Sequence, residues 1–269
     1  MKLLPYALFA VFFIIPLSPH GFLQAADPPA RDTQPGRAAP GREASLPCVR
    51  FNALNNLIRD NKIGRESARA ELKLLLAEIG KGYYAAGGID YPKTAWVFPL
   101  AGYDVRAIEG GRGHGFVARG YDYFTGNRHG GHPAFDIFIH DRRQQSLDDR
   151  TGAPVKVLSL AGGIVVALEQ EWEQGSGLRG GRYLWIYDPA HDLLVYYAHN
   201  GGLLVGLGEM VKPGDALATV GRSGYNAAKR RSPTHLHLSV LRIRDGRPVP
   251  LNVYRDLKNA KTVASKLEQ

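Results

Sequence analysis

The chain has 269 residues, of which 44% are hydrophobic and 22% are charged, and its formal net charge is +9. Such a composition excludes a chain that is disordered throughout. The single cysteine excludes an internal disulfide and any metal site built from four thiolates, so a metal would have to be bound by histidine and carboxylate side chains. The 32 glycines, 17 prolines, 13 tyrosines and 10 phenylalanines favour strands joined by tight turns. We therefore expect a mainly β fold.

Residues 1–26 are predicted to be a secretory signal peptide. Lys2 gives a short positive end, and the apolar core at residues 7–15 is bounded by Pro5 and Pro16. A membrane span needs about 20 apolar residues, so this core is too short for one. We therefore expect an exported protein, periplasmic or extracellular, with no stable membrane span after cleavage. An uncleaved membrane anchor is the alternative.

The positive charge favours a polyanionic partner. Cleavage after residue 26 would remove only Lys2, so the mature chain would keep a net charge of +8. Nucleic acid has the right sign of charge, but an exported protein does not meet it, and no nucleic-acid partner is expected. An anionic polymer of the cell envelope or a membrane face fits both the charge and the predicted location.

Two segments precede the predicted β domain. Residues 27–47 are rich in Pro, Gly, Ala and Arg without apolar periodicity, which predicts a flexible linker. Residues 48–90 show apolar residues at helical spacing and are predicted to form an accessory segment of two helices, the second ending near Gly80 and Gly82. We expect its apolar stripe to pack against the next domain, and a groove for a partner is the alternative.

Residues 91–257 are predicted to form one antiparallel β domain. Their β-branched and aromatic runs are bounded by Gly, Pro or Asp. The predicted strands do not alternate with helices, as they would in a parallel sheet. Residues 188–192, 212–215 and 245–246 are typical of tight turns or hairpins. Residues 258–269 are predicted to be a C-terminal tail.

The candidate chemistry begins with a pair of histidines in the run THLHL. His235 and His237 are two residues apart on a predicted strand, so their side chains face the same side about 6.6 Å apart. Both imidazoles can then face one cleft, which makes them candidates for a metal site. The alternative is that one of them faces solvent or makes a hydrogen bond in the core.

Two further segments carry candidate residues. In HPAFD, His132 and Asp136 would be about 13 Å apart on a straight strand, too far to share one ion. Pro133 makes a bend plausible, so we predict a bulge, turn or strand exit between residues 132 and 136. In YYAHN, His199 lies where a predicted strand runs out into glycines, a position from which it can overhang a site. An ordinary surface histidine is the alternative there.

In this order, and with KPGD before the last, HPAFD, YYAHN and THLHL resemble the motifs of the lysostaphin-like (LytM-type) zinc endopeptidases of peptidoglycan. The resemblance covers about residues 95–255. Ala134 stands where the family's HxGxD motif usually has glycine. The resemblance implies an antiparallel β-sheet or sandwich metallopeptidase domain, of the duplicated hybrid motif type, preceded by the short helical segment.

The resemblance also implies roles for five residues. One zinc per chain would be bound by His132, Asp136 and His237, which leaves His199 and His235 as the catalytic pair. Two imidazoles and one carboxylate leave an open fourth position for water, as expected of a catalytic zinc site. The implied function is hydrolysis of peptide stems or cross-links of peptidoglycan through a zinc-activated water. Which of His199 and His235 is the general base stays open.

Several alternatives remain from the sequence. His129 lies three residues before His132 and could replace it as a ligand. His140 could orient the residues of the site without binding the metal itself. The alternative function is a non-catalytic module of the same fold that binds peptidoglycan or activates another wall hydrolase. Such a module would lack one or more of the five residues, and all five are present. A carrier domain of the biotinyl type would need an exposed lysine in a tight hairpin, and none stands out.

Overall fold

The computed structural model describes residues 45–110 and 113–265. The predicted signal peptide and all but the last three residues of the predicted linker lie outside the described residues. The elements, in chain order, are α1 (Leu46–Arg59), α2 (Arg65–Ala85), the 3-10 helices η1 (Lys93–Ala95), η2 (Val105–Ala107) and η3 (Tyr123–Arg128), β1 (Ala134–Phe138), β2 (Lys156–Leu158), β3 (Gly163–Glu169), β4 (Arg182–Asp188), β5 (Leu193–Leu203), β6 (Met210–Val211), β7 (Ala216–Val220), β8 (His235–Arg244), β9 (Arg247–Pro250) and α3 (Tyr254–Asn259). Among the described helices, none combines the length and the apolar character that a membrane crossing requires.

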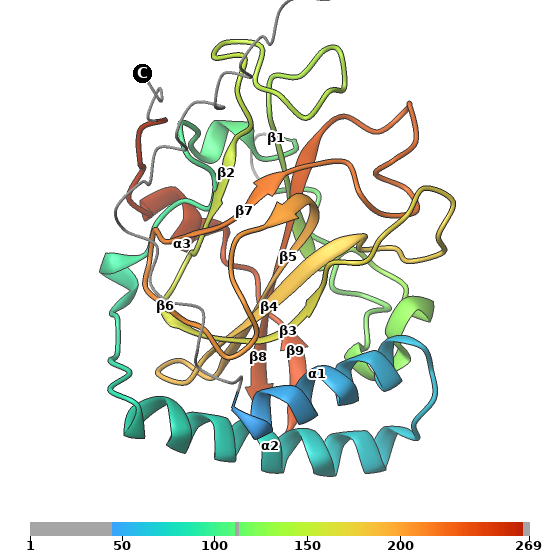
Figure 1. Cartoon of the computed structure of the whole chain (residues 1–269), viewed down its shortest axis with the longest axis vertical. Coiled ribbons are helices and arrows are strands. Elements are labelled where there is room, and N and C mark those ends of the chain that lie inside the picture. Colours follow the sequence, from blue (N-terminus) through green and yellow to red (C-terminus); the bar gives the residue numbers. More distant parts are fainter. Residues whose placement is uncertain (1–44, 111–112, 266–269) are drawn as a thin grey trace, which may run out of the picture. The chain divides into compact units, whose positions relative to one another are not determined.

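The described strands form one nine-stranded sheet, and every pairing between them is antiparallel. The strand order is β1-β8-β5-β4-β3-β6, with β2 paired to β7, β7 to β5 and β9 to β8 (Figure 1). The expected mainly β, antiparallel fold is therefore confirmed. The order places β8 between β1 and β5, so side chains from these three strands can meet on one face of the sheet.

The three turns predicted from the sequence are confirmed. Residues 189–192 join β4 to β5, with Asp192 at a positive φ of 52°. In the turn at residues 212–215 the amide of Asp215 donates to the carbonyl of Lys212 at 3.1 Å. Residues 245–246 join β8 to β9. The turns at 189–192 and 245–246 keep their flanking strands antiparallel and fix their register, whereas the turn at 212–215 leads from β6 to β7, which pair with other strands.

The sheet has a hydrophobic core on each face. On β8, Leu236, Leu238 and Val240 are buried in the first core, together with residues of β1 and β2. Because successive side chains of a strand point to opposite faces, His235 and His237 lie on the other face. That second face belongs to the core that includes α1 and α2.

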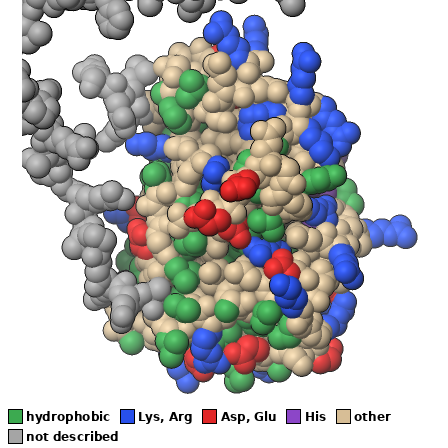
Figure 2. All heavy atoms as spheres, turned by 45° about the vertical axis from the view of Figure 1, so that its right-hand side comes forward, with side chains coloured by type: hydrophobic (Ala, Val, Ile, Leu, Met, Phe, Trp, Pro, Cys, Tyr) green, Lys and Arg blue, Asp and Glu red, His purple; other side chains and the backbone are tan. Residues whose placement is uncertain are grey.

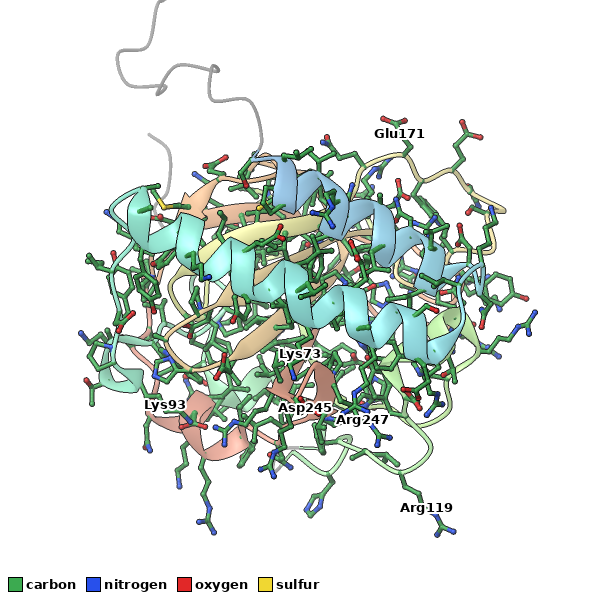
Figure 3. All side chains as sticks on the ribbon, turned by 90° about the horizontal axis from the view of Figure 1, so that it is seen from below. Lys73, Lys93, Arg119, Glu171, Asp245 and Arg247 are labelled. Atoms are coloured by element: carbon green, nitrogen blue, oxygen red, sulfur yellow. The ribbon has the colours of Figure 1, made fainter. Side chains whose placement is uncertain are left out.

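Helices α1 and α2 lie side by side across the second face of the sheet (Figures 1 and 3). Leu72 of α2 and Trp185 of β4 belong to the same core, so the predicted packing of the helical stripe against the β domain is confirmed. The buried Asn55 of α1 crosslinks the two layers, because its Nδ2 donates to Tyr183 Oη and its Oδ1 accepts from Tyr123 Oη, each at 3.1 Å. Both polar groups of this amide are therefore satisfied.

The helix boundaries differ from those predicted. Helix α1 begins at Leu46, inside the predicted linker, with Pro47 in its first turn, where a missing amide costs nothing. Helix α2 does not end at Gly80 and Gly82 but continues to Ala85. Burial of Tyr83, which is 3% exposed, stabilises the last turn of α2 and outweighs the low helix propensity of glycine.

The C-terminal segment is attached to the fold and is not a free tail up to residue 265. Lys258 lies within α3. The carbonyls of Lys261 and Val263 accept hydrogen bonds from the amides of Phe98 and Gly102, both at 2.8 Å. The predicted boundary between residues 257 and 258 therefore falls inside a helix.

Charged side chains lie on the outer surface. Figure 2 shows Lys and Arg side chains along the upper and right-hand edges of one face. In Figure 3, Lys73 of α2 lies next to Asp245 at the tip of the β8–β9 hairpin, and the two form an ion pair at 2.6 Å that Arg69 joins. These ion pairs are exposed and screened by solvent, so they contribute little to stability, and the buried cores determine how the helices dock.

We expect Leu72→Ala to lower the free energy of unfolding by about 2–5 kcal/mol, because it leaves a cavity between α2 and the sheet. Leu72 is fully buried, whereas Leu74 on the same helix is 60% exposed. Leu74→Ala is therefore the matched control and should change the free energy of unfolding by less than about 0.5 kcal/mol. Urea denaturation of the two variants measures both values. Equal effects of the two substitutions would contradict the helix packing described above.

Candidate functional site

Three of the residues singled out from the sequence meet on the helix-covered face of the sheet. Asp136 and His237 are directly opposite each other in the β1–β8 pairing, and Asp136 Oδ1 lies 2.9 Å from His237 Nδ1. Asp136 Oδ2 lies 3.3 Å from His132 Nε2. One potential ligand atom from each side chain lies within 4.8 Å of the other two. Within the described part of the chain, these are the side chains whose grouping is suited to a metal ion.

The chain bends between His132 and Asp136, as predicted. Strand β1 begins at Ala134, and His132 is instead paired with Val117, each amide donating to the other residue's carbonyl at 2.7 Å. Pro133 separates the two pairings. This exit from the strand turns His132 toward Asp136, which a straight ladder through all five residues would prevent.

A backbone carbonyl fixes the orientation of His132. Its Nδ1 lies 2.9 Å from the carbonyl oxygen of Gly115. Because a carbonyl can only accept, Nδ1 carries the proton and donates. Nε2 is therefore the nitrogen that faces Asp136.

The carboxylate of Asp136 is the electrostatic centre of the cluster. Burial alone would raise its pKa, but the hydrogen bonds from His132 and His237 hold that pKa well below its ordinary value. The hydrogen bond to Asp136 in turn raises the pKa of His132 to about 9, against the effect of burial. Burial lowers the pKa of His237. The site therefore contains one permanent negative charge, surrounded by imidazoles that can share it.

His235 lies two residues from His237 on the same face of β8 and is buried. Its Nδ1 is 2.8 Å from the carbonyl oxygen of Pro233, so this nitrogen donates. Its Nε2 is 3.7 Å from Asp136 Oδ1. The free nitrogen of His235 thus faces the cluster, as the alternation on β8 predicts.

His199 reaches the same face by an irregularity in β5. Ala198 is paired with His237, so strict alternation would place the side chain of His199 on the opposite face, with the core residue Tyr197. The register of β5 against β4 shifts at this point, and His199 has a positive φ of 66°. Such a bulge re-aims one side chain. The ring centroids of His199 and His235 are consequently only 4.9 Å apart.

The backbone of two loops holds His199. Its Nδ1 is 2.8 Å from the carbonyl of Ser223, and its amide donates to the carbonyl of Gly180 at 3.0 Å. Burial, together with the nearby His235 and His237, holds its pKa well below the ordinary value. His199 is therefore a neutral imidazole with Nδ1 protonated and Nε2 free to accept a proton.

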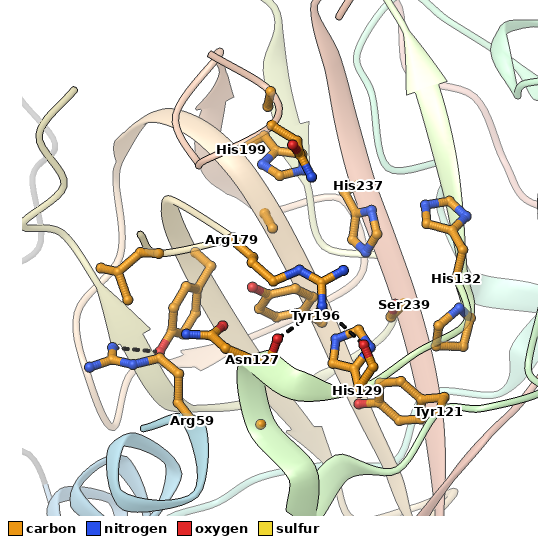
Figure 4. Close-up of a pocket in the computed structure, with 18 of the residues that line it drawn as sticks. Arg59, Tyr121, Asn127, His129, His132, Arg179, Tyr196, His199, His237 and Ser239 are labelled. Atoms are coloured by element: carbon orange, nitrogen blue, oxygen red, sulfur yellow. Dashed lines mark hydrogen bonds between the residues drawn. The ribbon is translucent and has the colours of Figure 1, made fainter. Parts of the chain in front are cut away.

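A cavity of about 310 Å³ extends from these five side chains across the same face. Figure 4 shows how residues from separate elements line it. Its remaining walls come mostly from α1, η3 and its flanks, β4, β5 and the loop before β4, and include Asn55, Ile58, Arg59, Tyr121, Tyr123, Asn127, His129, Leu178, Arg179, Tyr183, Trp185 and Tyr196. The accessory helix α1 is thus part of the wall of the candidate site.

Residues 143–250 match the model of peptidase family M23. An L-Ala–D-Glu endopeptidase of Bacillus subtilis is 30% identical over 194 residues, which cover 70% of this chain. The chain therefore contains a region that matches peptidase family M23. It spans 47% of the length of the Bacillus relative.

Solved structures of similar proteins include a zinc containing peptidase from Vibrio cholerae, 23% identical with a TM-score of 0.36, covering 58% of this chain and 38% of that one. The catalytic domain of lysostaphin from Staphylococcus simulans is 20% identical with a TM-score of 0.34, covering 48% of this chain and 80% of that domain. The M23 match contains His199, His235 and His237, whereas His132 and Asp136 lie just before it.

The competing histidines do not join the cluster. His129 lines the cavity, but its Nδ1 lies 3.0 Å from the carbonyl of Gly130 and its ring packs against Tyr121, with centroids 4.7 Å apart. It is not part of the group of converging ligand atoms. His140 packs against Tyr103, outside the walls of this cavity. Neither of the two alternatives is therefore supported by the geometry.

Sequence reasoning missed the wall residues of this cavity. Arg59 and Asn55 lie on a helix that the sequence placed outside the catalytic domain, and no local signal connects them to the site. Arg179 is the one charged residue in a glycine-rich stretch, residues 175–181, and that isolation was the available signal. Tyr197, two residues before His199, does not line the cavity: it is fully buried in the opposite core, where its hydroxyl accepts from the amide of Leu160.

We expect Gly224→Ala to displace His199 and to lower the free energy of unfolding by about 1–3 kcal/mol. An added Cβ would come within 2.5 Å of the carbonyl of Arg179 and 2.8 Å of His199 Nδ1, at a φ of +110°. Gly177→Ala in the neighbouring loop is the control, because its Cβ would meet nothing within 4 Å. Urea denaturation and the imidazole ¹⁵N signals of His199 measure the two effects. An unmoved His199 in Gly224→Ala would show that this loop does not position the ring.

Proposed function

We propose that this protein is an exported, zinc-dependent endopeptidase that hydrolyses the peptide stems or cross-links of peptidoglycan. The observation that carries the proposal is the convergence of His132, Asp136 and His237, with one ligand atom each within 4.8 Å of the others. The name of the Bacillus relative, an L-Ala–D-Glu endopeptidase, supports a peptide bond as the target. Export remains a proposal from residues 1–26, which lie outside the described residues.

The donor set fits one zinc ion per chain. Two imidazole nitrogens and one carboxylate oxygen are ligands that zinc prefers, whereas calcium and magnesium prefer oxygen alone. His132 Nε2 and His237 Nδ1 would be the nitrogen ligands. The hydrogen bond from His132 Nδ1 to the carbonyl of Gly115 is of the kind that orients a ligand imidazole.

When bound, zinc supplies a Lewis acid that lowers the pKa of water and polarises a carbonyl group. The chain's own part is proton transfer and charge stabilisation by His199 and His235. Both donate through Nδ1 to a backbone carbonyl, so both present an unprotonated Nε2 toward the cluster. Either can accept the proton of the attacking water at Nε2, and the same imidazole, now protonated there, can then donate that proton to the leaving amine.

The alternative function is a non-catalytic peptidoglycan-binding module or an activator of another wall hydrolase. All five residues are present, and the structure brings them to one cavity. A buried His199 held at a strained φ, with a free imidazole nitrogen, is costly for a module that only binds. These observations favour the enzyme.

The proposed organisation assigns catalysis to residues 91–257 and a share of the cavity wall to residues 48–90. The +8 charge of the mature chain suits an anionic cell envelope. No role for nucleic acid is proposed.

We expect one zinc per chain in protein purified without added metal, and its loss in His237→Ala. Without metal, the pKa of about 9 keeps a proton on His132 at neutral pH, so zinc must displace it and zinc affinity should fall as the pH is lowered. Elemental analysis and competition with a chelator at several pH values measure content and affinity. Equal zinc in wild type and His237→Ala would remove the metal site from the proposal.

We expect the full chain to release peptide fragments from purified wall sacculi, and His199→Ala and His235→Ala each to reduce this release by about 10²-fold or more. Both variants should keep their zinc, because neither residue belongs to the converging ligand atoms. Zymography followed by mass spectrometry of the fragments identifies the bond that is cut. Loss of zinc in either variant would mean that the roles of ligand and catalyst are wrongly divided.

A further inference from the structure

Arg179 bridges the two sides of the cavity. Its Nη1 donates to the carbonyl oxygens of Asn127 and His129, both at 3.0 Å, which links the loop before β4 to the end of η3 (Figure 4). The carbonyl of the next residue, Gly180, accepts from the amide of His199. The guanidinium is therefore held in a fixed place by the backbone segments that also lead to His132 and His199.

The charge of Arg179 is uncompensated by the protein. Among the described residues, no carboxylate forms an ion pair with it. Arg59, the other arginine of the cavity, is paired with Asp60 and Glu169, both at 2.8 Å. The one acidic residue among the described lining residues is Asp136, which is already shared by histidines.

The unused donors of Arg179 are its Nε and Nη2, for which the described residues provide no hydrogen-bond acceptor. The phenols of Tyr121 and Tyr196 have raised pKa values because they are buried, so no tyrosinate is available as a counter-ion. An arginine fork with free donors in a half-buried cavity matches the geometry of a carboxylate. Its partner must therefore come from the ligand.

We propose that Arg179 binds a free carboxylate of the substrate, carried by the residue next to the scissile bond, so that the enzyme selects acidic stem peptides. The inference rests on the proposed function, because it takes a peptide bond at the metal cluster as the reacting group. The hydrogen bonds from Nη1 to the carbonyls of Asn127 and His129 hold the Arg179 side chain in place. Its Nε and Nη2 then donate to the carboxylate. Arg179 is thus a specificity-determining residue and takes no part in bond cleavage.

The test compares two synthetic stem peptides that contain an L-Ala–D-Glu bond and differ in one group. One peptide carries the free carboxylate on its glutamate, and the other carries a carboxamide there. We expect the wild-type full chain to cleave the carboxylate peptide with a kcat/KM about 10-fold to 100-fold higher, the range for a hydrogen bond to a charged group. In Arg179→Gln, which keeps an amide donor for the carbonyls but loses the charge, the preference should fall to less than about 3-fold.

Arg182→Gln is the matched control. Arg182 also donates to backbone carbonyls, those of Gln170, Trp172 and Gly201, but it does not line the cavity. This variant should keep the wild-type preference. Zinc content and thermal unfolding, measured for every variant, verify that the metal cluster and the fold are intact.

The outcomes separate the two levels of inference. Failure of the wild type to cleave either peptide or any wall sacculus would overturn the proposed function. Cleavage of sacculi together with equal cleavage of the two peptides, or an unchanged preference in Arg179→Gln, would overturn the role of Arg179 alone. If Arg179→Gln does not fold, Arg179→Lys replaces it. A single ammonium cannot hold two carbonyls and a carboxylate together, so the preference should fall several-fold there, and an unchanged preference contradicts the proposal.

Discussion

A charged carboxylate within a protein must be paired, and in this molecule the pairing of Asp136 organises the site. Strand β8 has to lie beside β1 in one register, because a slip by one residue would place His237 on the opposite face and leave the carboxylate without its closest partner. The approach to β1 has to bend at Pro133 to add His132. The register of the sheet and the chemistry of the cluster therefore depend on each other.

The catalytic candidates are positioned by backbone rather than by other side chains. His199 and His235 each donate to a carbonyl oxygen, and this leaves the same ring nitrogen free in both. A carbonyl oxygen can only accept a hydrogen bond, so each of these contacts fixes the tautomer of the neutral imidazole. The cost is local strain at His199 and close packing around Gly224, both of which the surrounding loops must maintain.

The sequence was most informative where one periodicity decides the outcome. Alternation on β8 predicts that His235 and His237 share a face, and the length of an extended residue predicts the bend near Pro133. The orientation of His199 could not be predicted this way, because alternation alone places it with Tyr197 in the opposite core. It depends on a bulge, and a bulge is set by the neighbouring strand.

Contacts between segments that are distant in the sequence could not be predicted either, because they too depend on elements that local patterns do not specify. Asn55 meets Tyr183 across 128 residues of sequence, and nothing local to either residue indicates that α1 forms a wall of the cavity. The end of α2 was misplaced because glycine was weighed without the burial of Tyr83 that follows it. Arg179 could not be assigned from the sequence, because its contacts are carbonyl groups about 50 residues away.

The pairing of β1 with β8 also has a consequence for the order of events during folding. Asp136 and His237 are 101 residues apart in the chain, and contacts across such long loops form slowly because the entropy of loop closure must be overcome first. The hairpins β4–β5 and β8–β9 need only local contacts. A nascent or partly folded chain can therefore contain much of its sheet while its candidate metal ligands are still far apart. The three side chains of the candidate metal cluster converge only once β1 and β8, the paired strands farthest apart in the sequence, have closed on each other.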